Sequence, residues 1–238
     1  MLVQATSVLR KFHKAVFLQE EVNVMWPRII PFAAYMVFIG VSSLLPVDFG
    51  AELWLYPIKI AVVLGLLVYF WPSYQELQRP IFTDIKDVGL GIGVGVLVYV
   101  LWVRMDWSWA IQGDVTGYNP FLEGAAIGWG LAAVRIFGAS IVVPLMEELF
   151  WRSFLIRWVV NPDFEKVAFG TFTLASFVAT VVLFGLEHNL WLAGMMAGVA
   201  YNCLYYQTRR LWPCVVAHAT TNFILGMHVL ATQEWQWW

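Results

Sequence analysis

Residues 124–158 read GAAIGWGLAAVRIFGASIVVPLMEELFWRSFLIRW, an apolar run longer than a bilayer requires. A transmembrane helix needs about 20 mostly apolar residues, whereas a straight helix of this length would extend about 52 Å. The run must therefore protrude, tilt or break, and Pro144 is the residue most apt to break it. Glu147, Glu148 and Arg152 interrupt its apolar character. Because ionisable side chains are costly in a bilayer, the run indicates both a membrane fold and a site within it.

The composition of the whole chain is that of a polytopic membrane protein. Of its 238 residues, 61% are hydrophobic and 13% are charged, whereas soluble domains hold about 25% charged residues. The 14 tryptophans suit membrane–water interfaces. A net charge of −2 gives no reason to expect nucleic acid as a partner. The two cysteines, Cys203 and Cys214, support neither a disulfide framework nor a thiolate metal site.

Seven stretches are apolar and long enough to predict an all-α bundle of transmembrane helices. They are 29–45, 53–71, 88–105, 124–143 with an extension to 158, 171–188, 191–207 and 211–230. A break at Pro144 would give an eighth helix. The chain then divides into an N-terminal amphipathic surface segment, N-terminal transmembrane helices, a helical core that carries the motifs and an aromatic interfacial tail, at residues 1–28, 29–123, 124–230 and 231–238.

The distribution of Lys and Arg predicts that the N-terminus is cytoplasmic. Threading seven spans from that side places ten cations inside, namely Arg10, Lys11, Lys14, Arg28, Arg79, Lys86, Arg157, Lys166, Arg209 and Arg210. Only Lys59 and Arg104 fall outside or near the outer ends. This bias follows the positive-inside rule. With a compact chain and no targeting signal, we expect an integral protein of a prokaryotic plasma (inner) membrane, with membrane lipid around it.

Pairs of small residues predict where helices approach closely. Gly91–Gly95, Gly124–Gly128 and Gly194–Gly198 each have the spacing of such a contact. The first pair lies in the run GLGIGVG, which lacks the strand and the acidic residue of a dinucleotide-binding loop. We therefore interpret these glycines as packing residues.

Seven polar side chains within the spans need a function or a partner. They are Arg135, Glu147, Glu148, Arg152, His188, His218 and Asn222. Glu148 and Arg152 can pair because they are four residues apart, whereas Glu147 points about 100° away and has no local counter-charge. His218 and Asn222 lie one helical turn apart and face the same way. Taken singly, each group also fits a structural ion pair or a histidine at the interface.

Together, a carboxylate, two imidazoles and a carboxamide from three separate helices form a usual set for activating water. In one version, the carboxylate and an imidazole take a proton from water, and the carboxamide donates to the developing oxyanion. In the other, two histidines and one carboxylate bind zinc with an open fourth position. Both chemistries hydrolyse peptide bonds. A proton-coupled transporter would instead require internal repeats and broken helices in both halves, and the chain has no such pair.

With these residues in hand, the chain resembles the CPBP family of membrane proteins, which includes CAAX prenyl endopeptidases, bacteriocin-processing enzymes and Abi self-immunity proteins. The family hallmarks are Glu-Glu-x-x-x-Arg, Phe-x-x-x-His and His-x-x-x-Asn, in this order on successive helices. Here they stand at Glu147–Arg152, Phe184–His188 and His218–Asn222. Family members often carry Phe-Arg-Gly in the first motif, whereas this chain has Trp151-Arg152-Ser153.

The resemblance implies a role for each motif residue. Glu147 would be the catalytic base with the help of His188, while His218 and Asn222 would stabilise the oxyanion. The metal version instead makes Glu147, His188 and His218 ligands of an ion such as zinc. Glu148, Arg152 and Phe184 would have supporting roles.

The function that follows is an intramembrane endopeptidase acting on a membrane-anchored or hydrophobic peptide or protein. The alternative is a non-catalytic immunity or partner-binding protein on the same scaffold. Arg135 is a candidate for binding a substrate carboxylate. A pairing with Glu123, or a side chain extended to the interface, explains the same arginine without a substrate.

Overall fold

The computed structural model describes residues 24–42, 44, 51–78, 84–113, 117 and 119–238. Throughout these ranges the regular structure is helical, with no strand, so the predicted all-α membrane bundle is confirmed. The predicted surface helix within residues 1–28 lies mostly outside the described residues. Only its last five residues are described, and they begin the first helix, Val24–Ser42.

Each of the seven predicted apolar stretches forms a helix close to its expected bounds. After Val24–Ser42 come α2 (Ala51–Tyr69), α3 (Ile85–Trp102), a long helix over residues 125–158, α7 (Leu174–Leu186), α8 (Trp191–Thr208) and α9 (Trp212–Thr232). Among the described residues, five of these helices are long and apolar enough to cross a membrane. The exceptions are α7, which has only 13 residues, and α8, which carries Asn202 and several tyrosines.

The long helix continues through Pro144 rather than breaking there. It consists of α4 (Ala125–Phe137), a π-helical segment (Gly138–Val142), α5 (Val143–Glu148), a second π-helical segment (Leu149–Leu155) and α6 (Ile156–Trp158). Pro144 stands in the first turn of α5, directly after the first π segment. The wider π turn changes the backbone pairing where proline has no N–H to donate. The eight-helix alternative is thus not realised.

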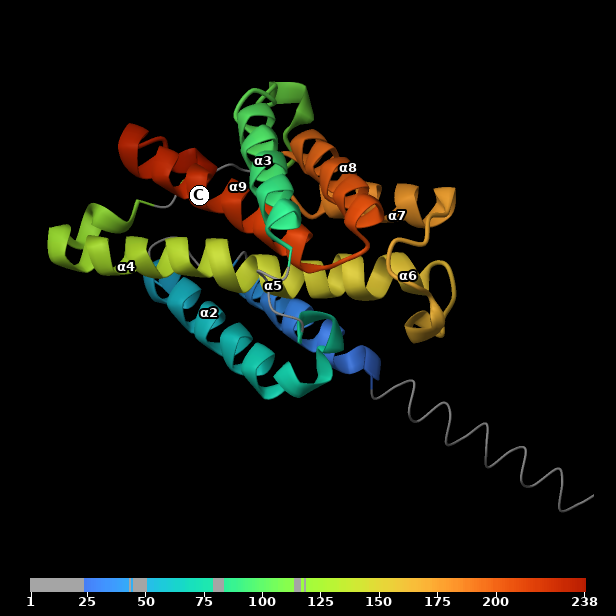
Figure 1. Ribbon diagram of the computed structural model, residues 1–238. Helices are drawn as coiled ribbons and strands as arrows, with labels where there is room; N and C mark the ends of the chain where they lie inside the picture. Colours follow the sequence, from blue (N-terminus) through green and yellow to red (C-terminus); the bar gives the residue numbers. More distant parts are fainter. Residues whose placement is uncertain (1–23, 43, 45–50, 79–83, 114–116, 118) are drawn as a thin grey trace, which may run out of the picture.

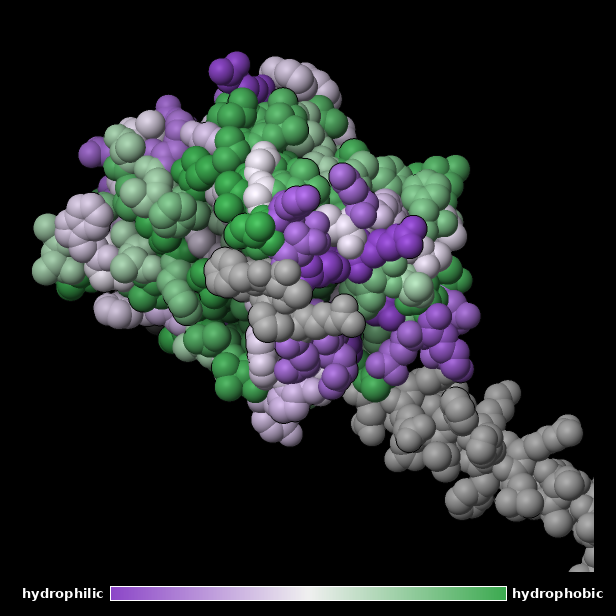
Figure 2. All heavy atoms as spheres, viewed as in Figure 1, coloured by the Kyte–Doolittle hydropathy of each residue, from purple (hydrophilic) through white to green (hydrophobic). Residues whose placement is uncertain are grey.

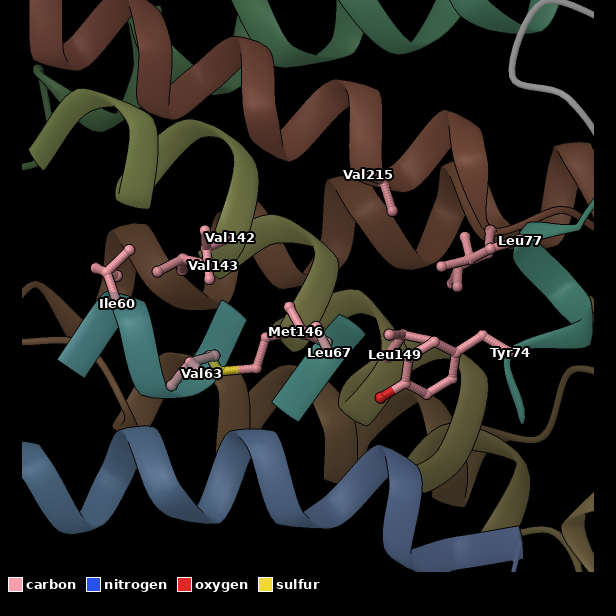
Figure 3. Packing of buried hydrophobic residues seen from close by; sticks show 11 residues of the cluster. Ile60, Val63, Leu67, Tyr74, Leu77, Val142, Val143, Met146, Leu149 and Val215 are labelled. Atoms are coloured by element: carbon pink, nitrogen blue, oxygen red, sulfur yellow. The ribbon is translucent and has the colours of Figure 1, made fainter. Parts of the chain in front are cut away.

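The long helix lies at the centre of the bundle (Figure 1). Helix Val24–Ser42 and α2 lie on one side of it, and α3, α7, α8 and α9 lie on the other. Figure 3 shows one core of this arrangement, where α2 presents Ile60, Val63 and Leu67 to Val142 and Met146. These residues recur every three or four positions, so each helix presents one apolar stripe to the other.

Two of the three predicted glycine pairs bring helices together. At Gly91 and Gly95 of α3, an added Cβ would collide with backbone oxygens of α9, and Gly194 of α8 lies against Gly185 of α7. The third pair is different, because Gly124 faces open space and precedes α4 with a φ of 93°. A left-handed backbone of this kind favours glycine for conformational reasons rather than packing.

The outer surface of the bundle is largely apolar. Large hydrophobic side chains on several helices are exposed, including Val37, Ile58, Leu97, Val178 and Phe223. On the face in Figure 2, hydrophobic residues cover wide areas and most hydrophilic residues gather in one region. Such a surface is stable in contact with lipid, so the chain is an integral membrane protein.

Candidate active site

The four predicted catalytic residues line one cavity of about 210 Å³. Glu147 comes from α5, His188 from the turn after α7, and His218 and Asn222 from α9. The predicted supporting residue Phe184 and the predicted substrate-binding residue Arg135 also line this cavity. Residues 75 positions apart in sequence thus meet because α5, α7 and α9 surround one space.

Glu148 is the buried centre of an ion-pair network beside this cavity. Its Oε1 accepts hydrogen bonds from Nη1 of Arg152 and Nδ1 of His218, both at 3.0 Å. Glu148 is 0% exposed and Arg152 is 1% exposed. The predicted pairing of Glu148 with Arg152 is confirmed. The bond to His218 was not predicted, and it connects the ion pair directly to a candidate catalytic residue.

Asn202 of α8 extends the network and was missed by the sequence analysis. Its Oδ1 accepts from Nε of Arg152 at 3.2 Å, and its Nδ2 donates to Oγ1 of Thr180 at 2.9 Å. Thr180 in turn donates to the carbonyl of Ser176 at 2.7 Å. Because Asn202 is 0% exposed and its carboxamide is satisfied on both sides, it fixes the guanidinium of Arg152. Asn202 could have been found from the sequence as a polar residue in an apolar stretch, which is the criterion that identified Asn222.

Oε2 of Glu147 is buried and has no hydrogen-bond partner within the described residues, and the same is true of Oε2 of Glu148. The two residues differ because Glu148 is held through its other oxygen, Oε1, by Arg152 and His218. The basic atom nearest to Oε2 of Glu147 is Nε2 of His218, at 3.9 Å. This distance is too long for a direct hydrogen bond. It is suited to a water molecule that bonds to both groups, as unsatisfied buried polar atoms often require.

The hydrogen bond to Glu148 determines which nitrogen of His218 carries a proton. A carboxylate beside Arg152 is an acceptor only, so Nδ1 of His218 is the donor. In neutral His218, Nε2 is therefore an acceptor on the side of Glu147. The ring of Tyr201 stacks on this imidazole, with 5.2 Å between centroids and 25° between planes, and holds it in place.

His188 and Asn222 are each oriented by a backbone carbonyl. Nδ1 of His188 lies 2.7 Å from the carbonyl oxygen of Phe184, so Nδ1 is the donor and Nε2 is an acceptor. Nδ2 of Asn222 donates to the carbonyl of Ala139 at 2.8 Å. Ala139 lies in the first π segment, where the altered backbone pairing leaves a carbonyl for the side chain. The second N–H of Asn222 is left for another acceptor.

The predicted zinc ligands do not form a ligand cluster in this arrangement. Among the described residues, no group of three or more His, Cys, Asp and Glu side chains is placed to hold a metal ion. Glu147 and His218 approach one another, but His188 does not complete a set with them. The zinc alternative therefore lacks structural support.

The two departures from the family motif have partners of their own. Nε1 of Trp151 donates to Glu187 at 3.1 Å. Ser153 donates to Glu76 and accepts from Nε of Arg28 at 3.1 Å, while Arg28 and Glu76 form an ion pair at 2.8 Å. Ser153 thereby connects the motif helix to helix Val24–Ser42 and to the turn after α2.

Replacing Ser153 by Ala is expected to reduce the free energy of unfolding by about 1 kcal/mol, because the Arg28–Glu76 pair remains but loses one buried hydrogen-bonding group. Unfolding in mixed detergent micelles would measure the loss. The control is Ser42→Ala, whose exposed hydroxyl bonds only to the carbonyl of Ile39 and should have little effect. Equal stability of the wild type and Ser153→Ala would contradict a structural role for this hydroxyl.

Arg135 lies at an aromatic part of the cavity. Its guanidinium carbon is 4.6 Å from the ring centre of Tyr56 and 5.6 Å from that of Trp238. The side chain of Glu123, the other predicted partner, lies outside the described residues. Trp237 and Trp238 line the cavity, so part of the predicted interfacial tail folds back over the site.

Comparison with known families agrees with this geometry. Residues 129–224 match the family model "Type II CAAX prenyl endopeptidase Rce1-like", and this range contains all three motifs. The class defined by the fold and the match is that of membrane endopeptidases. The part of the chain that carries the motifs is thus similar to the CAAX prenyl protease family, as the motifs predicted. No curated protein and no solved structure matches the chain significantly.

Proposed function

We propose that this protein is an intramembrane endopeptidase in which Glu147 activates water. The observation that carries the proposal is the 3.9 Å separation of Glu147 Oε2 and His218 Nε2 at the wall of the cavity. Within the described residues this carboxylate oxygen has no hydrogen-bond partner, whereas Glu148 beside it is held through Oε1 by Arg152 and His218. The two adjacent glutamates thus have different roles: Glu147 reacts and Glu148 positions.

In the proposed reaction, water bound between Glu147 and His218 attacks the carbonyl carbon of a peptide bond. Glu147 accepts one proton from the water, assisted by Nε2 of His188, and the carbonyl oxygen becomes an oxyanion. Asn222 donates an N–H to that oxygen. The proton held by Glu147 then passes to the amide nitrogen, the C–N bond breaks, and a carboxylic acid and an amine leave.

His218 supports the oxyanion only when its imidazole is protonated, because Nδ1 already donates to Glu148. An imidazolium would donate from Nδ1 to Glu148 and from Nε2 into the cavity. Glu148 is therefore a positioning residue for His218 as well as the partner of Arg152.

The substrate class follows from where the cavity lies. Apolar helices contribute its lining, which supports a peptide or protein anchored in the membrane as the substrate. The family name, which refers to prenylated substrates, supports a lipid-anchored substrate. The protein would lie in the plasma membrane of a prokaryote with its N-terminus in the cytoplasm, as the Lys and Arg distribution predicts.

The test uses the purified protein in lipid vesicles with a membrane-anchored fluorescent peptide. We expect cleavage at a defined peptide bond, identified by mass spectrometry, with a rate that does not follow the zinc content of the preparation. Folded protein without cleavage of any anchored peptide would favour the non-catalytic immunity or partner-binding protein. Activity proportional to bound zinc would favour the metal version.

Replacing Asn222 by Ala is expected to lower kcat by about 10²-fold and to change KM little, because the amide would act on the oxyanion and not on the bound substrate. Steady-state kinetics on the same peptide would separate the two constants. Thr232→Ala, at the far end of α9, is the control for changes to this helix. An increase in KM with kcat unchanged would assign Asn222 to substrate binding instead.

A further inference from the structure

A second cavity, of about 160 Å³, lies at the turn between α8 and α9 and shares no lining residue with the candidate active site. Its walls come from that turn, from the turn after α2 and from Phe169, and its lining residues are Gln75, Glu76, Phe169, Arg209, Arg210, Leu211 and Trp212. Two apolar helices end beside it, since one span ends at Ser73 and α9 begins at Trp212. The cavity therefore lies at the level where the membrane meets water.

The charged groups that remain for a ligand in this cavity are donors. Glu76 is engaged by Arg28 and Ser153. Arg210 uses Nη1 to bind Asp87 at 3.3 Å, while its Nη2 is buried and has no hydrogen-bond partner within the described residues. The side chain of Arg209 forms no ion pair with the residues that the structure describes. The local balance of charge is thus positive.

The backbone at Arg209 is an independent indication that its side chain has a role. This residue ends α8 in the left-handed conformation, with φ 54° and ψ 33°. Glycine is strongly favoured at such a position because it has no Cβ to strain. An arginine here destabilises the turn slightly, and this cost fits a use for its charge.

The chemistry of the walls selects the ligand. Two guanidinium groups bind a phosphate group well, because each presents several N–H donors in a planar fork. Leu211, Phe169 and Trp212 supply apolar surface next to these donors, which suits the glycerol and acyl parts of a lipid. We propose that this cavity binds the phosphate of an anionic phospholipid through Arg209 and Arg210.

A substitution at Arg209 separates binding from stability. Arg209→Gly removes the charge and also relieves the left-handed strain, so we expect its midpoint of thermal unfolding in neutral detergent to rise by about 2–4 °C. In vesicles of phosphatidylcholine with phosphatidylglycerol, the stabilisation that the anionic lipid gives the wild type should be lost. Binding of phosphatidylglycerol, measured by native mass spectrometry, should weaken about fivefold.

The chain offers two matched controls. Gln233 ends α9 in the same left-handed conformation, with φ 61°, so Gln233→Gly should raise the midpoint while keeping the response to anionic lipid. Arg104 is an exposed cation just after the C-terminal end of α3, whereas Asp87, the partner of Arg210, lies in the first turn of that helix. Arg104→Gln should therefore also keep the response to anionic lipid.

Three results would overturn the proposal. The first is an Arg209→Gly protein that responds to phosphatidylglycerol like the wild type. The second is an equal loss of response in Arg104→Gln, which would assign the effect to general surface charge. The third is full stabilisation of the wild type by inorganic phosphate, which would assign the site to a free anion.

Discussion

Glu147→Gln is expected to reduce the rate of peptide-bond cleavage by about 10³-fold while the protein remains folded and inserted. The carboxamide keeps the shape of the side chain but cannot accept a proton from water. Because Oε2 of Glu147 has no hydrogen-bond partner within the described residues, the change breaks no structural contact of that atom. Single-turnover cleavage of a membrane-anchored peptide and the midpoint of thermal unfolding are the two measurements.

Glu187 provides the matched control for this experiment. It is a second carboxylate near the motif residues, held by the indole of Trp151 at 3.1 Å, but it does not line the catalytic cavity. Glu187→Gln should therefore retain most of the activity. A loss as large as that of Glu147→Gln would contradict the assignment of the base to Glu147, and full activity of Glu147→Gln would remove the water-activation mechanism.

The positions of the helices could be predicted from sequence because a long apolar stretch in a membrane protein has few alternatives to a helix. The motif residues could also be found, since Glu147, His188 and His218 stand out in apolar surroundings. An ionisable side chain in a bilayer costs free energy, so each of them needs a function or a partner. Their meeting in one cavity depends on how α5, α7 and α9 pack. The sequence suggested that packing only through the order of the motifs.

What the sequence did not reveal depends on tertiary contacts. Asn202 and Thr180 are uncharged, so they carry a weaker signal than Arg152, whose guanidinium they hold. The π segments around α5 keep the long helix continuous at Pro144, whereas the residue type alone predicts a break. The bond from His218 to Glu148 joins residues 70 positions apart, and no local pattern encodes it.

The largest expected loss of stability follows from removing the partner of a buried carboxylate. Arg152→Met should reduce the free energy of unfolding by about 3–5 kcal/mol, because Glu148 then remains charged and buried without its counter-ion. Unfolding in mixed detergent micelles is the measurement. The Asp87–Arg210 pair is the comparison, because its side chains are 23% and 22% exposed. Asp87→Asn in neutral detergent should cost no more than about 1 kcal/mol.

A double variant separates the two roles of Glu148. Adding Glu148→Gln to Arg152→Met removes the buried charge, so most of the lost stability should return. Activity should stay low. A neutral amide can accept a hydrogen bond from Nδ1 of His218, but it stabilises an imidazolium far less than a carboxylate does. The same peptide assay, applied to the double variant, measures whether its activity returns together with its stability. Recovery of activity together with stability would show that Glu148 acts only as the counter-ion of Arg152, and that His218 needs no charged partner.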